Sequence, residues 1–159
     1  MKLKTLFAAA AAAALVAACG TDSPTASITI GPPPALPAGA QIVTTASGLQ
    51  YADFNVGSGA VAQSGNQVAV HYTLWLSNNT GIETSRGGPA VQFTLGDGNL
   101  IAGFNEGVTG MRVGGNRRLI IPPALGYGSQ PVVDQNTGRV VIPANSTLIF
   151  DIELVAVQP

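Results

Sequence analysis

The stretch from Gly96 to Gly128 constrains the fold of this chain more than any other part of it. Its first half is amphipathic with a helical period, and its apolar face consists of Ile101, Phe104, Val108 and Met111. Glycines follow, and the apolar run 119–121 predicts a buried strand that ends at Pro122-Pro123. Tyr127 then stands between two glycines. A helix against a strand, with a tyrosine on a glycine-flanked loop, predicts an apolar pocket with one polar group at its edge.

Alternating apolar residues predict strands on both sides of this stretch. The clearest are 68–76 and 148–154, whose predicted core sides are Val68, Val70, Tyr72, Leu74 and Leu76, and Leu148, Phe150, Ile152 and Leu154. We expect a first strand over 44–51, another over 91–95 and a loop over 129–145. Charged residues are only 9%, with 20 Gly and 11 Pro, which favours a small β-rich domain. The predicted fold class is α+β, a twisted antiparallel sheet of five to six strands wrapped on one short helix.

The N-terminus has the features of a targeting segment. Lys2 and Lys4 precede the apolar run 6–16, which is too short to span a bilayer, so residues 1–18 are predicted to be a signal peptide. The sequence Val-Ala-Ala-Cys at 16–19 resembles a bacterial lipobox, in which Cys19 would be acylated and anchor the protein in a membrane. An ordinary signal peptide followed by a chance cysteine is the alternative.

Residues 19–43 are rich in Pro, Ser, Thr and Ala, and they predict a tether between this lipid and a domain over 44–159. By resemblance to enterobacterial lipoproteins, Gly20 after the cysteine favours the outer membrane. The expected location is therefore the bacterial cell envelope, on the periplasmic face of that membrane.

Charge and residue counts exclude several classes of function. From Cys19 onward there are five Arg and eight acidic residues, a net charge of 5 − 8 = −3, so no nucleic-acid partner is expected. One histidine and one cysteine rule out ordinary Cys/His metal clusters, and neither a metal nor a cofactor is expected. His71 lies opposite the core side of its strand and is expected at the surface or in packing.

The run GFNEGVTGMRVGGNRRLIIPPALGYG, residues 103–128, resembles the signature of the FKBP-type peptidyl-prolyl isomerases. The similarity can be followed from Gly48 to Val155. It implies an enzyme that rotates X-Pro bonds, with proline-containing polypeptides as substrates and macrolides of the FKBP class as inhibitors. This reaction makes no bond and moves no proton, so it suits a chain without evident acid–base machinery.

The resemblance also implies roles for individual residues. VHYTLWL at 70–76 makes Tyr72 a wall of the proline pocket, and GFNEG places Phe104 at the pocket floor, where the family usually has Trp. The Ile101 N–H would meet the substrate carbonyl, and the Tyr127 hydroxyl would stand at the rim. The other implied substrate-binding residues are Ile82, Val91, Leu100, Val141, Ile142 and Phe150.

Two departures from the family pattern bear on activity. Ile82-Glu83-Thr84-Ser85 stands in place of Phe-Asp-Ser-Ser, so the wall is aliphatic and a glutamate replaces an aspartate of the site. We expect the extra methylene of Glu83 to displace its carboxylate from its hydrogen-bond partner, which the resemblance makes Tyr72. The insertion at 131–140 is expected to change substrate access. A weakly active or inactive module that binds proline-containing segments, or a purely structural assembly factor, are the alternatives.

Overall fold

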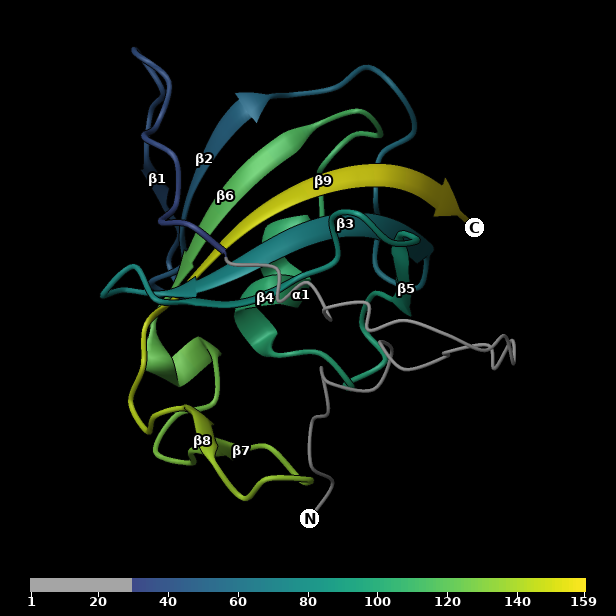
Figure 1. The fold of residues 1–159 in the computed structure, drawn as a ribbon. Coiled ribbons are helices and arrows are strands. Elements are labelled where there is room, and N and C mark those ends of the chain that lie inside the picture. The colour runs from purple at the N-terminus through teal and green to yellow at the C-terminus, as the bar shows by residue number, and fades with distance from the viewer. Residues whose placement is uncertain (1–29) are drawn as a thin grey trace, which may run out of the picture.

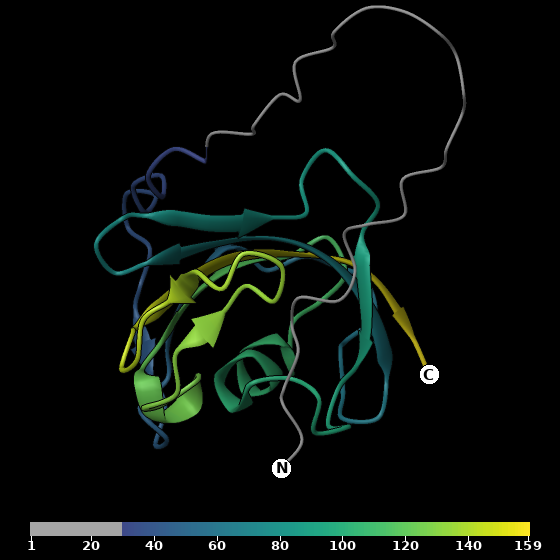
Figure 2. The ribbon, with the colours of Figure 1, turned by 60° about the horizontal axis from the view of Figure 1, so that its bottom comes forward.

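The computed structural model describes residues 30–159, so the predicted signal peptide and Cys19 lie outside the described part of the chain. A seven-stranded antiparallel sheet curves over one helix, α1 (Ala102–Val108), as Figures 1 and 2 show. Its strands are β1 (Val43–Thr44), β2 (Gln50–Asn55), β3 (Gln67–Leu76), β4 (Gly81–Thr84), β5 (Val91–Thr94), β6 (Asn116–Ile121) and β9 (Leu148–Gln158). Their order is β1-β2-β6-β9-β3-β4, and β5 also pairs with β3. No helix of residues 30–159 is long and apolar enough to cross a membrane.

The predicted fold class is confirmed, but the number of strands is larger than predicted. The expected single strand over 44–51 is a hairpin, because Gly48 has a φ of +92° and turns the chain between β1 and β2. The expected loop over 129–145 contains a separate two-stranded hairpin of β7 (Val132–Val133) and β8 (Val140–Ile142), preceded by the short 3₁₀-helix η1 (Pro123–Leu125). These short strands have too few residues to show a period of two.

Strand β3 is the centre of the sheet, since it pairs with β9 on one side and with β4 and β5 on the other. The alternating residues predicted to face the core, in both β3 and β9, are all buried. They form one hydrophobic core with the predicted apolar face of α1. The alternation in the sequence therefore identified the inner face of both strands correctly.

Two glycines bring α1 very close to the sheet. A Cβ atom on Gly103 would lie 2.5 Å from Cγ2 of Ile121, and one on Gly107 would lie 2.4 Å from Cδ1 of Leu119. Both glycines therefore face β6 at a distance that other residues do not allow. The Arg117 guanidinium also joins the two elements, because it donates to the Gly107 carbonyl at 3.0 Å and forms an ion pair with Asp53.

The first described residues lie on the outer face of the sheet, although the sequence predicts them to be part of a tether. The Trp75 indole on β3 donates to the Gly31 carbonyl at 2.6 Å, and Arg118 on β6 donates to the Pro34 carbonyl at 2.8 Å. A proline-rich segment lacks the period of a helix or a strand, so its sequence does not predict which surface of the domain it contacts.

The close approach of α1 predicts the effect of adding one methyl group. Gly107→Ala should lower the free energy of unfolding by about 1 kcal/mol, because overpacking costs about 1–3 kcal/mol while helix propensity returns about 1 kcal/mol. Leu119→Val removes atoms from the overlap, so in a double-mutant cycle it should recover part of the loss. Urea unfolding measures all four proteins. If the effects of the two substitutions on the free energy of unfolding were strictly additive, the Leu119 side chain would not limit how closely α1 approaches β6.

Candidate active site

Phe104 of α1 lies at the centre of a cluster of aromatic rings. Because Gly103 and Gly107 face β6, the Phe104 ring turns into the core, where its exposed fraction is 0%. Its centroid lies 5.3 Å from that of Phe150 and 6.4 Å from that of Tyr72. Phe93 completes the cluster at 5.2 Å from Phe104. All three rings meet Phe104 edge to face, an arrangement that favours a fixed apolar surface.

The walls around Phe104 come from neighbouring strands. Tyr72 on β3 and Phe150 on β9 point to the same side of the sheet, because Leu74 pairs with Phe150 and Tyr72 pairs with Ile152. The rings of Tyr72 and Phe150 are 5.9 Å apart. The register of β3 against β9 therefore brings Tyr72, the predicted wall, beside Phe150, a predicted substrate-binding residue.

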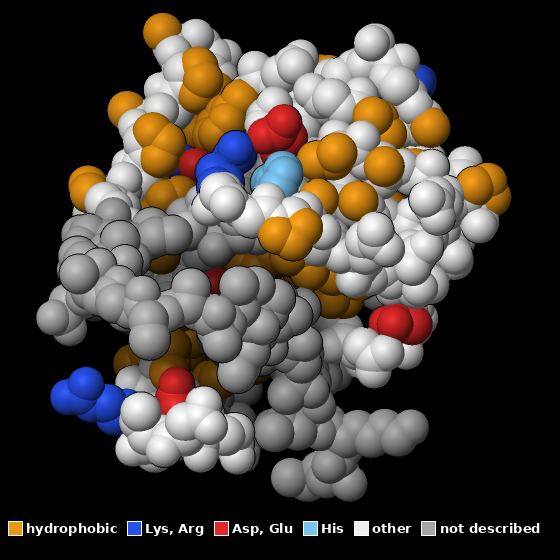
Figure 3. Space-filling view, turned by 45° about the vertical axis from the view of Figure 1, so that its right-hand side comes forward, with side chains coloured by type: hydrophobic (Ala, Val, Ile, Leu, Met, Phe, Trp, Pro, Cys, Tyr) orange, Lys and Arg blue, Asp and Glu red, His pale blue; other side chains and the backbone are white. Residues whose placement is uncertain are grey.

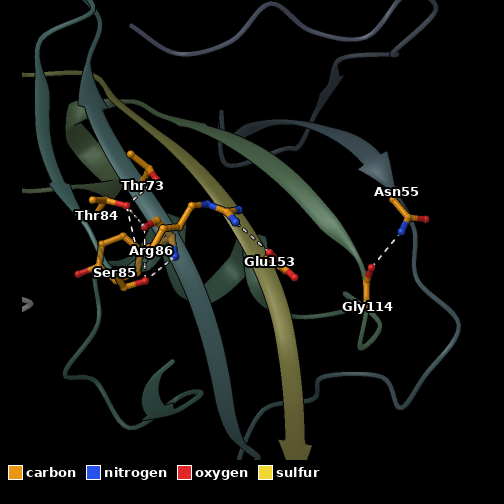
Figure 4. A network of polar contacts seen from close by, with 8 residues as sticks. Asn55, Thr73, Thr84, Ser85, Arg86, Gly114 and Glu153 are labelled. Carbon is orange, nitrogen blue, oxygen red and sulfur yellow. Dashed lines mark hydrogen bonds and ion pairs between the residues drawn. The ribbon is translucent and has the colours of Figure 1, made fainter. Parts of the chain in front are cut away.

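Hydrogen bonds at the edge of the sheet fix β4 against β3, as Figure 4 shows. The Tyr72 N–H donates to Ser85 Oγ at 2.9 Å, and the Ser85 N–H donates back to the Tyr72 carbonyl at 3.0 Å. On the opposite face, the hydroxyls of Thr73 and Thr84 lie 2.9 Å apart. Glu83 directly precedes Thr84 on β4 and pairs with Leu74, so its side chain points to the same side as Tyr72.

Glu83 is half-buried, and its carboxylate interacts with Tyr72. Burial raises the pKa of Glu83 from its ordinary value of 4.5, and a hydrogen bond from Tyr72 partly opposes this shift. Burial, followed by the charge of Glu83, also raises the pKa of Tyr72 well above its usual range. The carboxylate of Glu83 thus lies close enough to Tyr72 to affect its pKa, and the displacement expected from the extra methylene stays a prediction. Its Oε2 atom has no hydrogen-bond partner within residues 30–159.

Tyr127 supplies a second polar group to this side of the cluster. The turn that carries it follows η1 and is closed by the Gly128 N–H, which donates to the Pro123 carbonyl at 2.9 Å. The Tyr127 hydroxyl is buried, and none of the described residues is its hydrogen-bond partner. Burial raises the pKa of Tyr127 to about 12, and the charge of Glu83 adds to the shift. The hydroxyl therefore stays protonated near neutral pH and is available to donate.

Ile101 stands at the start of α1 with extended backbone angles, φ −63° and ψ 144°. Its carbonyl accepts from the N–H groups of Phe104 and Asn105, while its own N–H donates to no group of residues 30–159. Its side chain and that of Leu100 are buried in the core. A backbone donor therefore lies three residues before the floor ring.

The remaining predicted residues divide into two groups. Ile82, Val91 and Val141 are partly buried and pack against the core, so they can border a ligand. Ile142 is fully buried and supports the cluster from behind. The predicted site residues within the described chain thus come together around one centre, and their roles in binding and catalysis stay predictions.

Phe93 is the residue that the sequence analysis missed. The sequence predicts that Phe93 lies in a strand over 91–95, but it does not indicate a role for Phe93 in the site. The available signal was the alternation of Val91, Phe93 and Leu95, which places all three side chains on the inner face of β5. Phe104 is smaller than the Trp that the family usually has at the pocket floor. A second aromatic residue on the inner face of β5 is therefore an expected neighbour of the Phe104 ring.

His71 and the acidic residues do not form a second centre. Residues 30–159 contain no group of three or more His, Cys, Asp or Glu side chains that could hold a metal ion. His71 is half-buried on the face of β3 opposite the aromatic cluster and pairs with Glu153. The expectation that His71 lies away from the site is confirmed.

Known proteins are similar to this chain in sequence. The family model for FKBP-type peptidyl-prolyl cis-trans isomerases matches residues 58–155. FK506-binding protein 3 of Candida albicans is 45% identical over 115 residues, which are 72% of this chain and 25% of that protein. The chloroplastic peptidyl-prolyl cis-trans isomerase FKBP16-4 of Arabidopsis thaliana is 39% identical over 124 residues, covering 72% of this chain and 50% of that protein. The chain thus spans between a quarter and a half of the length of these curated relatives.

Two solved structures have the same fold over the same part of the chain. The crystal structure of FkpA from Escherichia coli matches with a TM-score of 0.63 and 36% identity, covering 74% of this chain and 52% of that one. The crystal structure of AtFKBP13 matches with a TM-score of 0.66 and 34% identity, covering 73% of this chain and 98% of that one. With more than half of its residues matched by the family model, the chain belongs to the FKBP-type peptidyl-prolyl cis-trans isomerase family.

Proposed function

We propose that this protein is a peptidyl-prolyl cis-trans isomerase that accelerates X-Pro bond rotation in polypeptides, with the aromatic cluster around Phe104 as its active site. The observation that carries the proposal is the aromatic cluster, in which three rings surround Phe104 and the buried Tyr127 hydroxyl has no hydrogen-bond partner among residues 30–159. A proline ring is apolar and flat enough to lie on such a surface, and the carbonyl before it needs a polar partner. Macrolides of the FKBP class are the expected inhibitors.

The rate enhancement follows from desolvation and hydrogen bonding. The barrier of about 20 kcal/mol comes from amide resonance, which is lost when the X-Pro bond is twisted. A dry aromatic pocket favours the less polar twisted amide over the planar one. The Ile101 N–H and the Tyr127 hydroxyl are the available donors for the substrate carbonyls. Lowering the barrier by about 6 kcal/mol would give about a 10⁴-fold acceleration.

Glu83 tunes this site through its charge. Burial raises the pKa values of both Tyr72 and Tyr127, and the charge of the half-buried Glu83 carboxylate adds to both shifts. Both tyrosines therefore stay protonated, and neither needs to transfer a proton during rotation of the bond. We assign to Glu83 the positioning of the Tyr72 ring rather than acid–base catalysis.

We further propose that the domain acts in the bacterial envelope, held there by a lipid on Cys19. The support is the order of basic residues, apolar run and cysteine over residues 1–19. In this arrangement residues 1–18 are removed, and the isomerase domain begins near residue 44. Its substrates would be proteins that fold after export.

A binding module with weak or no activity is the alternative function. Its support is the replacement of an aromatic wall by Ile82, which leaves less aromatic surface around a twisted amide. Rate measurements with a proline-containing peptide separate the two functions, because only the isomerase shortens the relaxation time of the X-Pro bond. Binding of a macrolide without acceleration would favour the module.

The first prediction concerns the pocket floor. Phe104→Leu keeps most of the side-chain volume and should fold, but it removes the aromatic surface that the substrate proline contacts. We expect kcat/KM for an X-Pro peptide to fall at least about tenfold, which corresponds to about 1.4 kcal/mol. The control is Phe104→Trp, which should retain activity and tighten macrolide binding. A folded Phe104→Leu protein with full activity would place the reaction elsewhere.

The second prediction concerns the charge of Glu83. Because burial raises its pKa above 4.5, the folded protein holds this proton more tightly than the unfolded chain does. The resulting stability is fully present below pH 4.5 and is lost as the pH rises through the raised pKa. Glu83→Gln cannot ionise, so its unfolding free energy should exceed that of the wild type by an amount that grows across this pH window.

Urea unfolding at a series of pH values between 4 and 8 tests this expectation. Tyr72→Phe is the matched variant, because it removes the hydrogen bond that lowers the pKa of Glu83 and should extend the window to higher pH. A difference between Glu83→Gln and the wild type that stays constant with pH would mean that the carboxylate is not desolvated by folding.

The third prediction concerns the membrane anchor. Cys19→Ala should release the protein from the membrane fraction or stop its processing, since the only cysteine of the chain is then lost. Fractionation, with the mass of the mature N-terminus, measures both outcomes. If an ordinary signal peptide is present instead, wild type and variant will both be soluble after cleavage, and the lipid proposal fails.

A further inference from the structure

Residues 30–37 form a segment, here called the strap, that crosses the outer face of the sheet. Ile30 covers the start of β4, where a Cβ atom on Gly81 would lie 2.5 Å from the Ile30 Cβ. The Gly31 carbonyl accepts from the Trp75 indole of β3 at 2.6 Å. The Pro34 carbonyl accepts from Arg118 of β6 at 2.8 Å. In the order β6-β9-β3-β4 these contacts lie on three strands, so the strap runs across them rather than along an edge.

The sequence of the strap imposes a polyproline II conformation. Gly31, Pro32 and Pro33 each precede a proline, which excludes the helical region, and each proline ring fixes its own φ. A polyproline II helix has three residues per turn and no internal hydrogen bonds, so its carbonyls are free to accept. The strap follows this period twice. The half-buried side chains are Ile30, Pro33 and Leu36, and the two bonded carbonyls, at 31 and 34, are also three residues apart.

The sheet presents matching donors at fixed positions. Arg118 is held by Asp151 through two hydrogen bonds of 2.6 Å, which leaves its Nη1 to donate to the strap. The Phe54 ring lies 5.3 Å from the Arg118 guanidinium. The Trp75 side chain is only 5% exposed, and its one donor is used by Gly31. An aromatic surface with an indole donor is a general way to bind polyproline II segments.

The surface extends beyond the strap. A cavity of about 390 Å³ lies beside Pro34, and its lining includes Phe54, Trp75, Thr73 and Asp151. It continues to Arg86, which reaches across the sheet to Glu153 at 3.0 Å, as Figure 4 shows. Figure 3 shows basic, acidic and histidine side chains gathered on this side of the molecule. The groove therefore has an aromatic part and a charged end.

We propose that the outer face of the sheet is a second proline-recognition surface, which binds polyproline II segments through Trp75, Arg118 and Phe54, and that the strap is its resident ligand. This surface lies on the opposite face of the sheet from the aromatic cluster, because Thr73 and Trp75 alternate with Tyr72 and Leu74 along β3. It recognises a conformation and its carbonyls, whereas the proposed active site would take a single proline. The inference does not depend on the proposed isomerase activity.

The only tryptophan of the chain provides the test, because it reports on this surface alone. In the full-length protein, replacing Pro32, Pro33 and Pro34 together by Ala should loosen the strap, since the unfolded segment gains conformational freedom. We expect Trp75 emission to shift to the red and acrylamide quenching to rise. Pro33→Ala alone should give a smaller change of the same sign. The control is Pro131→Ala, an exposed proline outside the strap, which should change neither signal.

A synthetic peptide of residues 30–38 should then restore the blue-shifted emission of the triple variant in a saturable way. The titration should reach about 10 mM, above the roughly millimolar effective concentration of a tethered segment. The same peptide with its three consecutive prolines replaced by Ala should bind far more weakly. Unchanged Trp75 signals in the triple variant would overturn the proposal. So would the absence of peptide binding, or equal binding of both peptides, since the strap would then be only packed chain.

Discussion

The contact between α1 and β6 is the constraint on which the site depends. Gly103 and Gly107 let the helix backbone approach Ile121 and Leu119 so closely that a Cβ atom at either position would force a neighbouring side chain to shift. At that separation the Phe104 ring reaches the space between β3, β5 and β9 and meets three other rings. If the helix stood further from the sheet, the floor would lose these edge-to-face contacts. The position of the aromatic cluster is therefore set by backbone packing as much as by the aromatic residues themselves.

The aromatic cluster also has buried polar groups beside it that form no hydrogen bonds with the described residues. The Tyr127 hydroxyl and Glu83 Oε2 are buried without hydrogen bonds among the described residues, which normally costs stability. In a binding site, such groups are satisfied when a ligand supplies the missing carbonyl or amide. The raised pKa values of Glu83 and Tyr127 have the same origin, since low solvation penalises their charged forms. Stability is thus reduced at the proposed binding site.

The sequence predicts the fold class and the inner face of the long strands, and the family resemblance supplies most of the candidate site. Periods of two or 3.6 residues place Tyr72, Phe104 and Phe150 in the core, because these residues lie in segments where the period is clear. Phe93 was missed because its strand has only four residues, and its partner is distant in the chain. The strap was missed for another reason. Its position is fixed by hydrogen bonds from Trp75 and Arg118, which are distant in the chain. The sequence of a proline-rich segment does not indicate whether such donors are present elsewhere in the protein.

The two-sided use of β3 has a consequence for how this domain can change. Tyr72 and Leu74 face the helix, while Thr73 and Trp75 face the strap. Inserting or deleting one residue ahead of them would exchange the two sets, placing the tryptophan in the core and the tyrosine beneath the prolines. Variation in this strand is therefore confined to substitutions that preserve its length. The loops between strands are free of that restriction, and the extra residues at 131–140 are of this permitted kind.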